Sequence, residues 1–360
     1  MRQAALDRWI KILGVASALA FASTVQAARP HTRDVPVADR AAASAAAEFQ
    51  AHQVAMRRAN AAVVGIETMA VEDARSSENL GRERQGSGVL INADGLVLTI
   101  GYLILEADHV DLVLADSKRV PARVVAYDLA TGFGLVQALA PLGLLPAPLG
   151  VSAAVASDEP LMVASGGGDA ELSLARMVSR RPYSGFWEYH IDSALFTAPA
   201  HEHHSGAGLF NADGELLGIG SLVVRDAGGR SAPALLGNMF VPVDLLKPIL
   251  AELTSRGASQ GSTRAWLGIN CVEDEGRVRV LRLTADGPAG DAGLRPADTI
   301  VAVDGVAVAD LASFYKTLWQ GEGADRDVMI DVLRGAGQQP LRLQVHAIDR
   351  MRTLSRPAGI

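Results

Sequence analysis

The chain has 360 residues, of which 49% are hydrophobic and 20% are charged, and its formal net charge is -7 at pH 7. This length leaves room for two or three domains, and the apolar content excludes an intrinsically disordered chain. The acidic balance, without clusters of Lys and Arg, excludes nucleic acid as an expected partner.

Residues 1–27 have the pattern of a secretory signal peptide. Arg2, Arg8 and Lys11 form a basic start, and the apolar run 12–21 that follows is shorter than the ~20 residues needed to cross a bilayer. Small residues up to Ala27 match a signal-peptidase site. We therefore expect cleavage after Ala27 and a periplasmic or secreted mature protein, with retention as a membrane anchor as the alternative.

Residues 28–60 are rich in Ala, and the stretch from Ala41 to Met56 contains neither Gly nor Pro, which predicts a linker followed by a helix. Residues 61–253 consist of short β-branched runs separated by Gly, Asp-Gly or Pro. The segments Asn92–Gly95 and Asn211–Gly214 are strong turn signals between such runs. Many short strands at this spacing predict a β-sandwich or a β-barrel.

The run from Asp244 to Leu253 is apolar-periodic and predicts a helix with Asp244 as N-cap and Pro248 near the start. Residues 254–264 are rich in Gly and Ser and form the best linker between domains. Residues 265–348 form a smaller unit of strands with one helix near Leu311 to Gln320, and residues 349–360 form a tail.

Cys271 is the only cysteine, so an internal disulfide is excluded and stability must come from the core. It lies between two expected strands, and no His stands near it in the sequence. We interpret it as a small buried hydrophobic residue and not as a nucleophile.

Three blocks of this sequence occur in the same order in one family. The first is Gly86–Ile91 with Asp94–Thr99, the second Ser205–Asn211 with Gly214–Ile219, and the third Trp266–Ile269 with Gly287–Asp298. Together they resemble the HtrA (DegP-type) serine proteases over residues 60–348. The resemblance implies a mainly β fold, with a trypsin-like double β-barrel over residues 61–253 and an α+β PDZ domain over residues 265–348.

The resemblance places Ser205 at the position of the nucleophile, but the two residues that should activate it are absent. The family carries its catalytic His in a Leu-Thr-x-x-His pattern, and the matching run 98–102 ends in Tyr102. The catalytic Asp follows an Asp-x-x-Thr pattern, and the matching run 128–132 ends in Gly132. A serine hydroxyl needs an imidazole to accept its proton and a carboxylate to orient that imidazole.

Tyr102 is a poor substitute for the base, because half-ionising a phenol of pKa ~10 at neutral pH costs about 4 kcal/mol. His203 stands where the family has a Gly whose N–H helps to form the oxyanion hole, and a residue with a Cβ resists some backbone angles that Gly adopts. We therefore expect the site around Ser205 to be inactive.

The cluster His201, Glu202, His203 and His204 raises the alternatives of a zinc site or a local base for Ser205. The spacing is not the metalloprotease H-E-x-x-H, because Ser205 occupies the position of the second His. On an extended segment His201 and His203 would point to one side and His204 to the other, which disfavours His204 as a base. We expect an exposed polar loop, no metal and no cofactor.

The PDZ resemblance implies a groove for the C-terminus of a peptide. The backbone of Trp266, Leu267, Gly268 and Ile269 would hold the peptide carboxylate. The helix near Leu311 to Gln320 would form the other wall. Phe314, Leu318 or both would face the peptide, with a role in the domain core as the alternative.

A second departure from the family lies in a turn of this unit. Ala297 replaces the Gly that is usual between Pro296 and Asp298. The shape of that turn is therefore in question, because Gly tolerates backbone angles that Ala disfavours.

Taken together, the sequence predicts an exported HtrA-like pseudoprotease that binds peptides or unfolded protein segments through its PDZ domain. Such a protein would act as an adaptor, a chaperone-like holder or a regulator. Because the family forms trimers, the resemblance also implies a homo-oligomer or association with active relatives. The alternatives are a serine endopeptidase of periplasmic protein quality control with a non-standard base, and a metal-dependent role at the His cluster.

Overall fold

The computed structural model describes residues 37–335 and 339–355. The expected signal peptide and its cleavage site after Ala27 lie outside these residues. Within them, no helix combines the length and the hydropathy that a membrane crossing requires.

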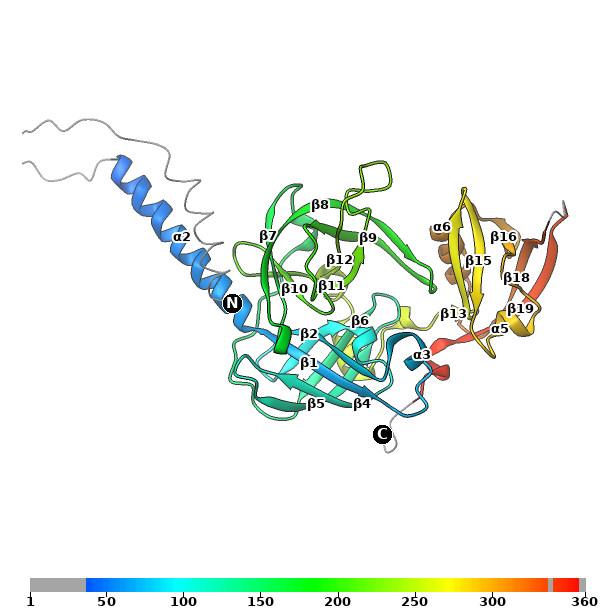
Figure 1. Cartoon of the computed structure of the whole chain (residues 1–360), viewed down its shortest axis with the longest axis horizontal. Coiled ribbons are helices and arrows are strands. Elements are labelled where there is room, and N and C mark those ends of the chain that lie inside the picture. The colour runs from blue at the N-terminus through cyan, green and yellow to red at the C-terminus, as the bar shows by residue number, and fades with distance from the viewer. Residues whose placement is uncertain (1–36, 336–338, 356–360) are drawn as a thin grey trace, which may run out of the picture.

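The first element is the helix α2 (Val37–Ala61), which projects from the body of the molecule (Figure 1). The predicted helix is confirmed and extends beyond both ends of the stretch without Gly and Pro. Its C-terminal part is anchored, because Met56 and Ala59 are fully buried against the core.

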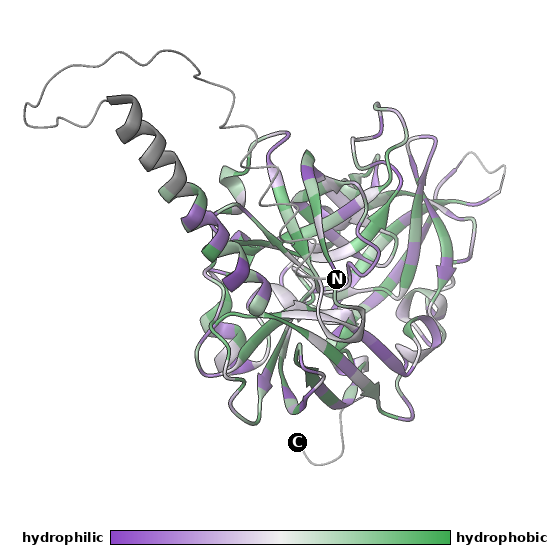
Figure 2. Cartoon of the chain, turned by 60° about the vertical axis from the view of Figure 1, so that its left-hand side comes forward, coloured by the Kyte–Doolittle hydropathy of each residue, from purple (hydrophilic) through white to green (hydrophobic). Residues whose placement is uncertain are grey.

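The expected strand-rich region forms two closed six-stranded barrels, and Figure 2 shows hydrophobic residues concentrated on their strands. The first barrel has the strand order β1-β2-β3-β6-β5-β4. It consists of β1 (Val63–Ala70), β2 (Glu83–Leu90), β3 (Leu96–Ile100), β4 (Ala107–Val113), β5 (Arg119–Tyr127) and β6 (Phe133–Ala138), with the short helices α3 (Ser77–Leu80) and η1 (Gly101–Leu103).

The second barrel has the order β10-β11-β12-β9-β8-β7. It consists of β7 (Pro160–Ala164), β8 (Leu172–Gly185), β9 (Tyr189–Ala198), β10 (Gly208–Phe210), β11 (Leu216–Val224) and β12 (Gly237–Pro242), with the short helices η2 (Ser152–Ala154) and η3 (Gly167–Asp169). The strands β8 and β9 form a long hairpin that extends from the barrel toward the C-terminal domain (Figure 1).

Both predicted Asn-x-Asp-Gly turns are confirmed, one between β2 and β3 and one between β10 and β11. In the first, the side-chain oxygen of Asn92 accepts hydrogen bonds from the N–H groups of Asp94 and Leu96, at 3.1 and 2.8 Å. Gly95 and Gly214 then take φ angles of 88° and 72°, in the left-handed region that favours Gly. The turn chemistry therefore sets the register of both hairpins.

The helix expected from Asp244 to Leu253 is wrong in its first half. The structure has a 3₁₀ turn, η4 (Val243–Leu245), and the α-helix α4 begins only at Leu250 and ends at Arg256. Pro248 explains the break, because it lacks an N–H and disfavours the helical conformation of the residue before it. Asp244 is consequently not the N-cap of an α-helix. Its carboxylate accepts the N–H of Ala153 at 2.8 Å.

The segment expected to be a linker is fastened to the first barrel by a buried carboxylate. Asp128 is fully buried and accepts hydrogen bonds from the hydroxyls of Ser259 and Ser262, the latter in the short helix η5 (Gln260–Ser262). Its other oxygen accepts the N–H and the hydroxyl of Thr131, at 2.8 and 2.6 Å. The segment thus fixes the C-terminal domain to the barrels and is not a free spacer.

The C-terminal domain is a 7-stranded sheet with the order β13-β19-β18-β16-β15-β14, and β17 pairs with β16. Its strands are β13 (Ala265–Trp266), β14 (Ile269–Asp274), β15 (Arg277–Leu283), β16 (Thr299–Val303), β17 (Val306–Ala307), β18 (Arg326–Leu333) and β19 (Leu341–Asp349), with the helices α5 (Pro288–Asp291), α6 (Leu311–Gln320) and η6 (Arg350–Thr353). The bounds of α6 agree with the sequence prediction. Cys271 is fully buried in β14, as expected for a core residue.

Ala297 keeps the turn in the conformation that Gly would take. Its φ angle is 72°, in the left-handed region where a Cβ is strained. The following residue, Asp298, is buried and paired with the guanidinium of Arg334 at 2.7 Å. The turn is therefore strained at Ala297.

Candidate active site and peptide groove

The two barrels bring Ser205 and Tyr102 into direct contact. Tyr102 lies in η1, directly after β3, and Ser205 lies in the turn before β10. The hydroxyl oxygens of the two residues are 2.8 Å apart, and the Tyr102 hydroxyl is also 2.9 Å from the carbonyl oxygen of Ser221. The side chain that hydrogen-bonds the Ser205 hydroxyl is therefore a phenol and not an imidazole.

The hydrogen bonds fix where the protons lie. The carbonyl of Ser221 can only accept a hydrogen bond, and the Tyr102 hydroxyl has one proton to donate. Both contacts are satisfied when Tyr102 donates to Ser221 and Ser205 donates to the phenol oxygen. A neutral phenol is a very weak proton acceptor, so this arrangement does not activate the serine.

Ionised Tyr102 is also out of reach at neutral pH. Burial raises the pKa of Tyr102 to about 12, and the hydrogen bond with Ser205 only partly opposes this effect. Half-ionisation at pH 7 would require the pKa of Tyr102 to fall from about 12 to 7, which costs about 7 kcal/mol. Half-ionising a tyrosine with an ordinary pKa of ~10 would cost only about 4 kcal/mol.

Gly132 stands at the expected position of the acid, and a tyrosine from the second barrel fills the space beside it. Its φ angle is 80°, and a Cβ on this residue would lie 3.1 Å from the hydroxyl oxygen of Tyr189. The Tyr189 hydroxyl donates a hydrogen bond to the carbonyl of Thr131 at 2.7 Å. No local sequence signal pointed to Tyr189, because its contact depends on how the two barrels pack.

His203 occupies the expected oxyanion-hole position with a negative φ, so it does not need the conformation reserved for Gly. The special backbone lies one residue beyond the serine. Gly206 has a φ of 73°, and a Cβ there would lie 1.9 Å from the carbonyl oxygen of Ser87. The turn is further held by hydrogen bonds from the N–H of Ser87 to the Ser205 carbonyl and from the N–H of Gly206 to the Gly220 carbonyl, at 2.8 and 2.9 Å.

A pocket of about 150 Å³ lies beside Ser205. Its walls come from β1, β2, the segment 166–168 and the turn that carries the serine, and they include Glu67, Gln85 and His203. The pocket is polar and partly lined by glycine backbone. It therefore forms a concave surface next to the Ser205 hydroxyl, which is hydrogen-bonded with Tyr102.

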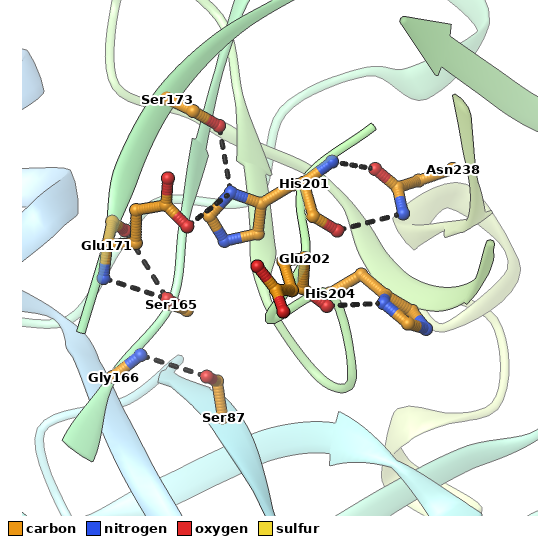
Figure 3. Close-up of polar contacts among 9 residues, drawn as sticks. All are labelled: Ser87, Ser165, Gly166, Glu171, Ser173, His201, Glu202, His204 and Asn238. Atoms are coloured by element: carbon orange, nitrogen blue, oxygen red, sulfur yellow. Dashed lines mark hydrogen bonds and ion pairs between the residues drawn. The ribbon is translucent and has the colours of Figure 1, made fainter. Parts of the chain in front are cut away.

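The segment from His201 to His204 is not an extended chain, and His201 is not exposed. The segment forms turns, and His201 is 2% exposed, with its Nδ1 2.8 Å from the hydroxyl of Ser173 (Figure 3). Its backbone N–H and carbonyl both bond the side chain of the buried Asn238, at 2.6 and 3.2 Å. Burial lowers the pKa of His201 to about 4, so its imidazole is neutral at physiological pH.

The other histidines of the cluster do not complete a metal site. His204 directs its Nδ1 to the carbonyl of Glu202 at 2.9 Å (Figure 3), and burial lowers the pKa of His204. Over residues 37–335 and 339–355, no group of three or more His, Cys, Asp or Glu side chains is arranged to hold a metal ion. The expectation of an exposed polar loop is wrong for His201, which has a structural role.

The loop expected to bind a carboxylate does so in this structure. The N–H of Leu267 donates to one carboxylate oxygen of Glu188 at 2.8 Å, and the N–H groups of Gly268 and Ile269 donate to the other at 3.2 and 3.3 Å. Trp266 precedes them in β13 and is buried. Glu188 lies between β8 and β9, at the tip of the hairpin, and no sequence pattern pointed to this contact.

On the other wall of the groove, Phe314 and Leu318 are fully buried in the core of the C-terminal domain, which agrees with the core alternative. The α6 side chain that reaches the tip of the hairpin is Tyr315. Its hydroxyl donates to the carbonyl of Gly185 at 2.8 Å and accepts the N–H of Glu188 at 3.2 Å. Tyr315 was not among the predicted groove residues, although it is adjacent to Phe314 on the predicted helix.

Comparison with known domain families agrees with this architecture. The trypsin-like peptidase domain matches residues 86–219, and the PDZ domain matches residues 265–345. The protein therefore combines a trypsin-like peptidase domain with one PDZ domain, and the fold class predicted from the sequence is confirmed.

Related proteins narrow this class. A DegP-like periplasmic serine endoprotease of Ectopseudomonas mendocina (strain ymp) is 29% identical over 272 residues, which are 70% of this chain and 56% of the relative. The serine protease HhoA of Synechocystis sp. is 26% identical over 286 residues, covering 72% of this chain and 70% of that protein. The chain is thus similar to DegP-like and HtrA-type serine proteases, and it spans a little over half the length of the DegP-like relative.

Solved structures show the same fold. The HtrA-type protease AlgW with a tripeptide has a TM-score of 0.52 and 20% identity, and the match covers 86% of this chain and 99% of AlgW. AlgW with a decapeptide gives a TM-score of 0.53 at 20% identity, over 83% and 98% of the two chains. At this identity the likeness establishes the fold alone.

Proposed function

We propose that this protein is an exported pseudoprotease of the HtrA family that binds peptides or unfolded protein segments through its PDZ domain. It would act as an adaptor, a chaperone-like holder or a regulator. The contact between Ser205 and Tyr102 carries the proposal, because a serine that donates to a neutral phenol lacks a proton acceptor. Export is supported by the pattern of residues 1–27 and by relatives that are named periplasmic.

The expected loss of activity is large. Removing the residues that activate a catalytic serine lowers turnover by up to roughly 10⁶, and roughly 10³–10⁴ over water remains where the oxyanion hole is intact. The pocket beside Ser205 also offers a concave surface that would hold a peptide segment without cleaving it.

The test uses a fluorophosphonate probe and casein digestion on the protein without residues 1–27. We expect labelling and digestion to be no greater than in Ser205→Ala, with trypsin as the positive control. Labelling or cleavage that disappears in Ser205→Ala would contradict the proposal and favour a serine endopeptidase with a non-standard base.

Restoring the two missing residues is not expected to restore cleavage. In Tyr102→His/Gly132→Asp, the new carboxylate would stand on a backbone with a φ of 80° and would meet the hydroxyl of Tyr189. A clear gain of casein cleavage in this double variant would show that the site accommodates the acid and that the account of Tyr189 is wrong.

We also propose that the mature protein forms a homo-oligomer or associates with active relatives. The similarity to HtrA-type proteases supports this proposal, and sedimentation of the purified protein, alone and mixed with an active relative, measures it directly. A monomer that does not bind the relative would remove this part of the proposal.

A further inference from the structure

The tip of the β8–β9 hairpin lies in the groove that the PDZ fold reserves for a peptide. The residues 185–188 pass between the edge strand β14 and the helix α6, and Figure 1 shows the hairpin reaching from the second barrel toward the C-terminal domain. The contacts there reproduce two parts of peptide recognition, the binding of a carboxylate and the addition of a strand.

The first part is the carboxylate. Glu188 is 9% exposed, and its two oxygens accept three backbone hydrogen bonds from consecutive residues, Leu267 to Ile269. Consecutive N–H groups that converge in this way form a site for one carboxylate. A peptide C-terminus would need the same three donors, so it and Glu188 cannot occupy the loop together.

The second part is strand addition. β14 is the last strand of its sheet, and the N–H of Cys271 on its open edge donates to the carbonyl of Phe186 at 2.9 Å. On the opposite side, the Tyr315 hydroxyl bonds backbone groups of Gly185 and Glu188. The hairpin tip therefore uses the main-chain positions that an added peptide strand would use.

Charged pairs at the margin of the groove reinforce this docking. Lys316 on α6 pairs with Asp192 on β9, and Arg230, in the loop before β12, pairs with Glu273 on β14.

The backbone of Glu188 is also strained. Its φ of 57° lies in the left-handed region, which a residue with a Cβ adopts less readily than Gly.

We propose that Glu188 is an internal ligand of the PDZ domain, and that a peptide with a free C-terminal carboxylate binds by displacing the β8–β9 tip from the groove. The protease-like domain of the same chain thus occupies the PDZ groove, and a peptide partner must compete with the hairpin tip for it. The inference deepens the proposed function and rests on its peptide-binding part.

The first experiment measures the closure without any peptide. Amide hydrogen exchange of residues 267–271 is compared in the wild type, in Glu188→Ala and in the control Glu322→Ala, whose carboxylate lies on an exposed loop after α6. We expect exchange in Glu188→Ala to be at least tenfold faster and the control to be unchanged. Glu188→Gly, which also relieves the positive φ, should give the same result. Equal protection in all proteins would overturn the proposal.

The second experiment adds the competitor. The probe is a pool of fluorescein-labelled decapeptides with three randomised C-terminal residues, prepared with a free carboxylate or with a C-terminal amide. We expect the free-carboxylate pool to bind Glu188→Ala at least tenfold more tightly than the wild type or the control, and the amidated pool not to bind. Equal affinity for the wild type and Glu188→Ala would overturn the proposal.

The two experiments separate the inference from the function on which it rests. If exchange is faster in Glu188→Ala but neither pool binds any variant, the internal ligand is supported and the peptide-binding function is contradicted. If the pool binds all variants equally and exchange does not change, the peptide-binding function is supported and the internal ligand is contradicted.

Discussion

The carboxylate of Glu188 makes docking of the β8–β9 tip depend on pH. Burial raises the pKa of Glu188 to about 7, and the N–H groups of Leu267, Ile269 and Gly268, together with Arg350, oppose this effect only in part. In an undocked hairpin the carboxylate is in water and titrates near its ordinary value of 4.5. The docked state thus holds the proton more tightly, so docking is strongest below pH 4.5 and weakens as the pH rises to about 7.

The size of the effect follows from the two pKa values. A rise from 4.5 to about 7 corresponds to about 3 kcal/mol, or a change of a few hundredfold in the docking equilibrium at most. The neighbouring ionisable side chains do not reproduce this pH dependence of Glu188. Burial raises the pKa of both Tyr315 and Cys271, which keeps them neutral, while burial lowers the pKa of His190.

The assay is the protection factor of the amides of Gly268 and Ile269, measured at pH 5 and pH 8 and corrected for intrinsic exchange. We expect wild-type protection to fall by tenfold or more at pH 8. Glu188→Gln keeps an acceptor oxygen and cannot titrate, so its protection should not depend on pH. Wild-type protection that is the same at both pH values, or an equal fall in Glu188→Gln, would refute the assignment to Glu188.

Three further predictions concern stability and are checked by urea unfolding. Ala297→Gly should stabilise the protein by roughly 1 kcal/mol, because it removes left-handed strain at a φ of 72°; a destabilisation would mean that this strain is absent. Asp128→Asn should destabilise by about 3 kcal/mol, because the buried carboxylate accepts four hydrogen bonds and the amide cannot accept all of them; no loss would show that the linker is held by other contacts. Gly132→Ala should cost about 1–2 kcal/mol, since its Cβ is strained at a φ of 80° and meets Tyr189, and the double variant with Tyr189→Phe should recover part of the loss.

Predictions that rest on local chemistry were confirmed. The two Asn-x-Asp-Gly turns, the helix from Leu311 to Gln320 and the burial of Cys271 all depend on residues close together in the chain. The capping of α6 shows why, because Asp310 and Ser313 bond each other's backbone within one turn. Where a local signal was overridden, as in the helix expected at Asp244, the cause was another local residue, Pro248, that was given too little weight.

The sequence by itself determined the strands and turns, and its family resemblance predicted a carboxylate-binding loop and placed Tyr102 and Gly132 at the two positions expected to activate Ser205. Only the tertiary structure decided what these residues and this loop contact. Tyr102 meets Ser205 across 103 residues, and Glu188 meets Leu267 across 79. The physical reason is that turn and helix signals act over a few residues of backbone, whereas these contacts form only after two barrels and a sheet have packed together and brought distant side chains within hydrogen-bonding distance.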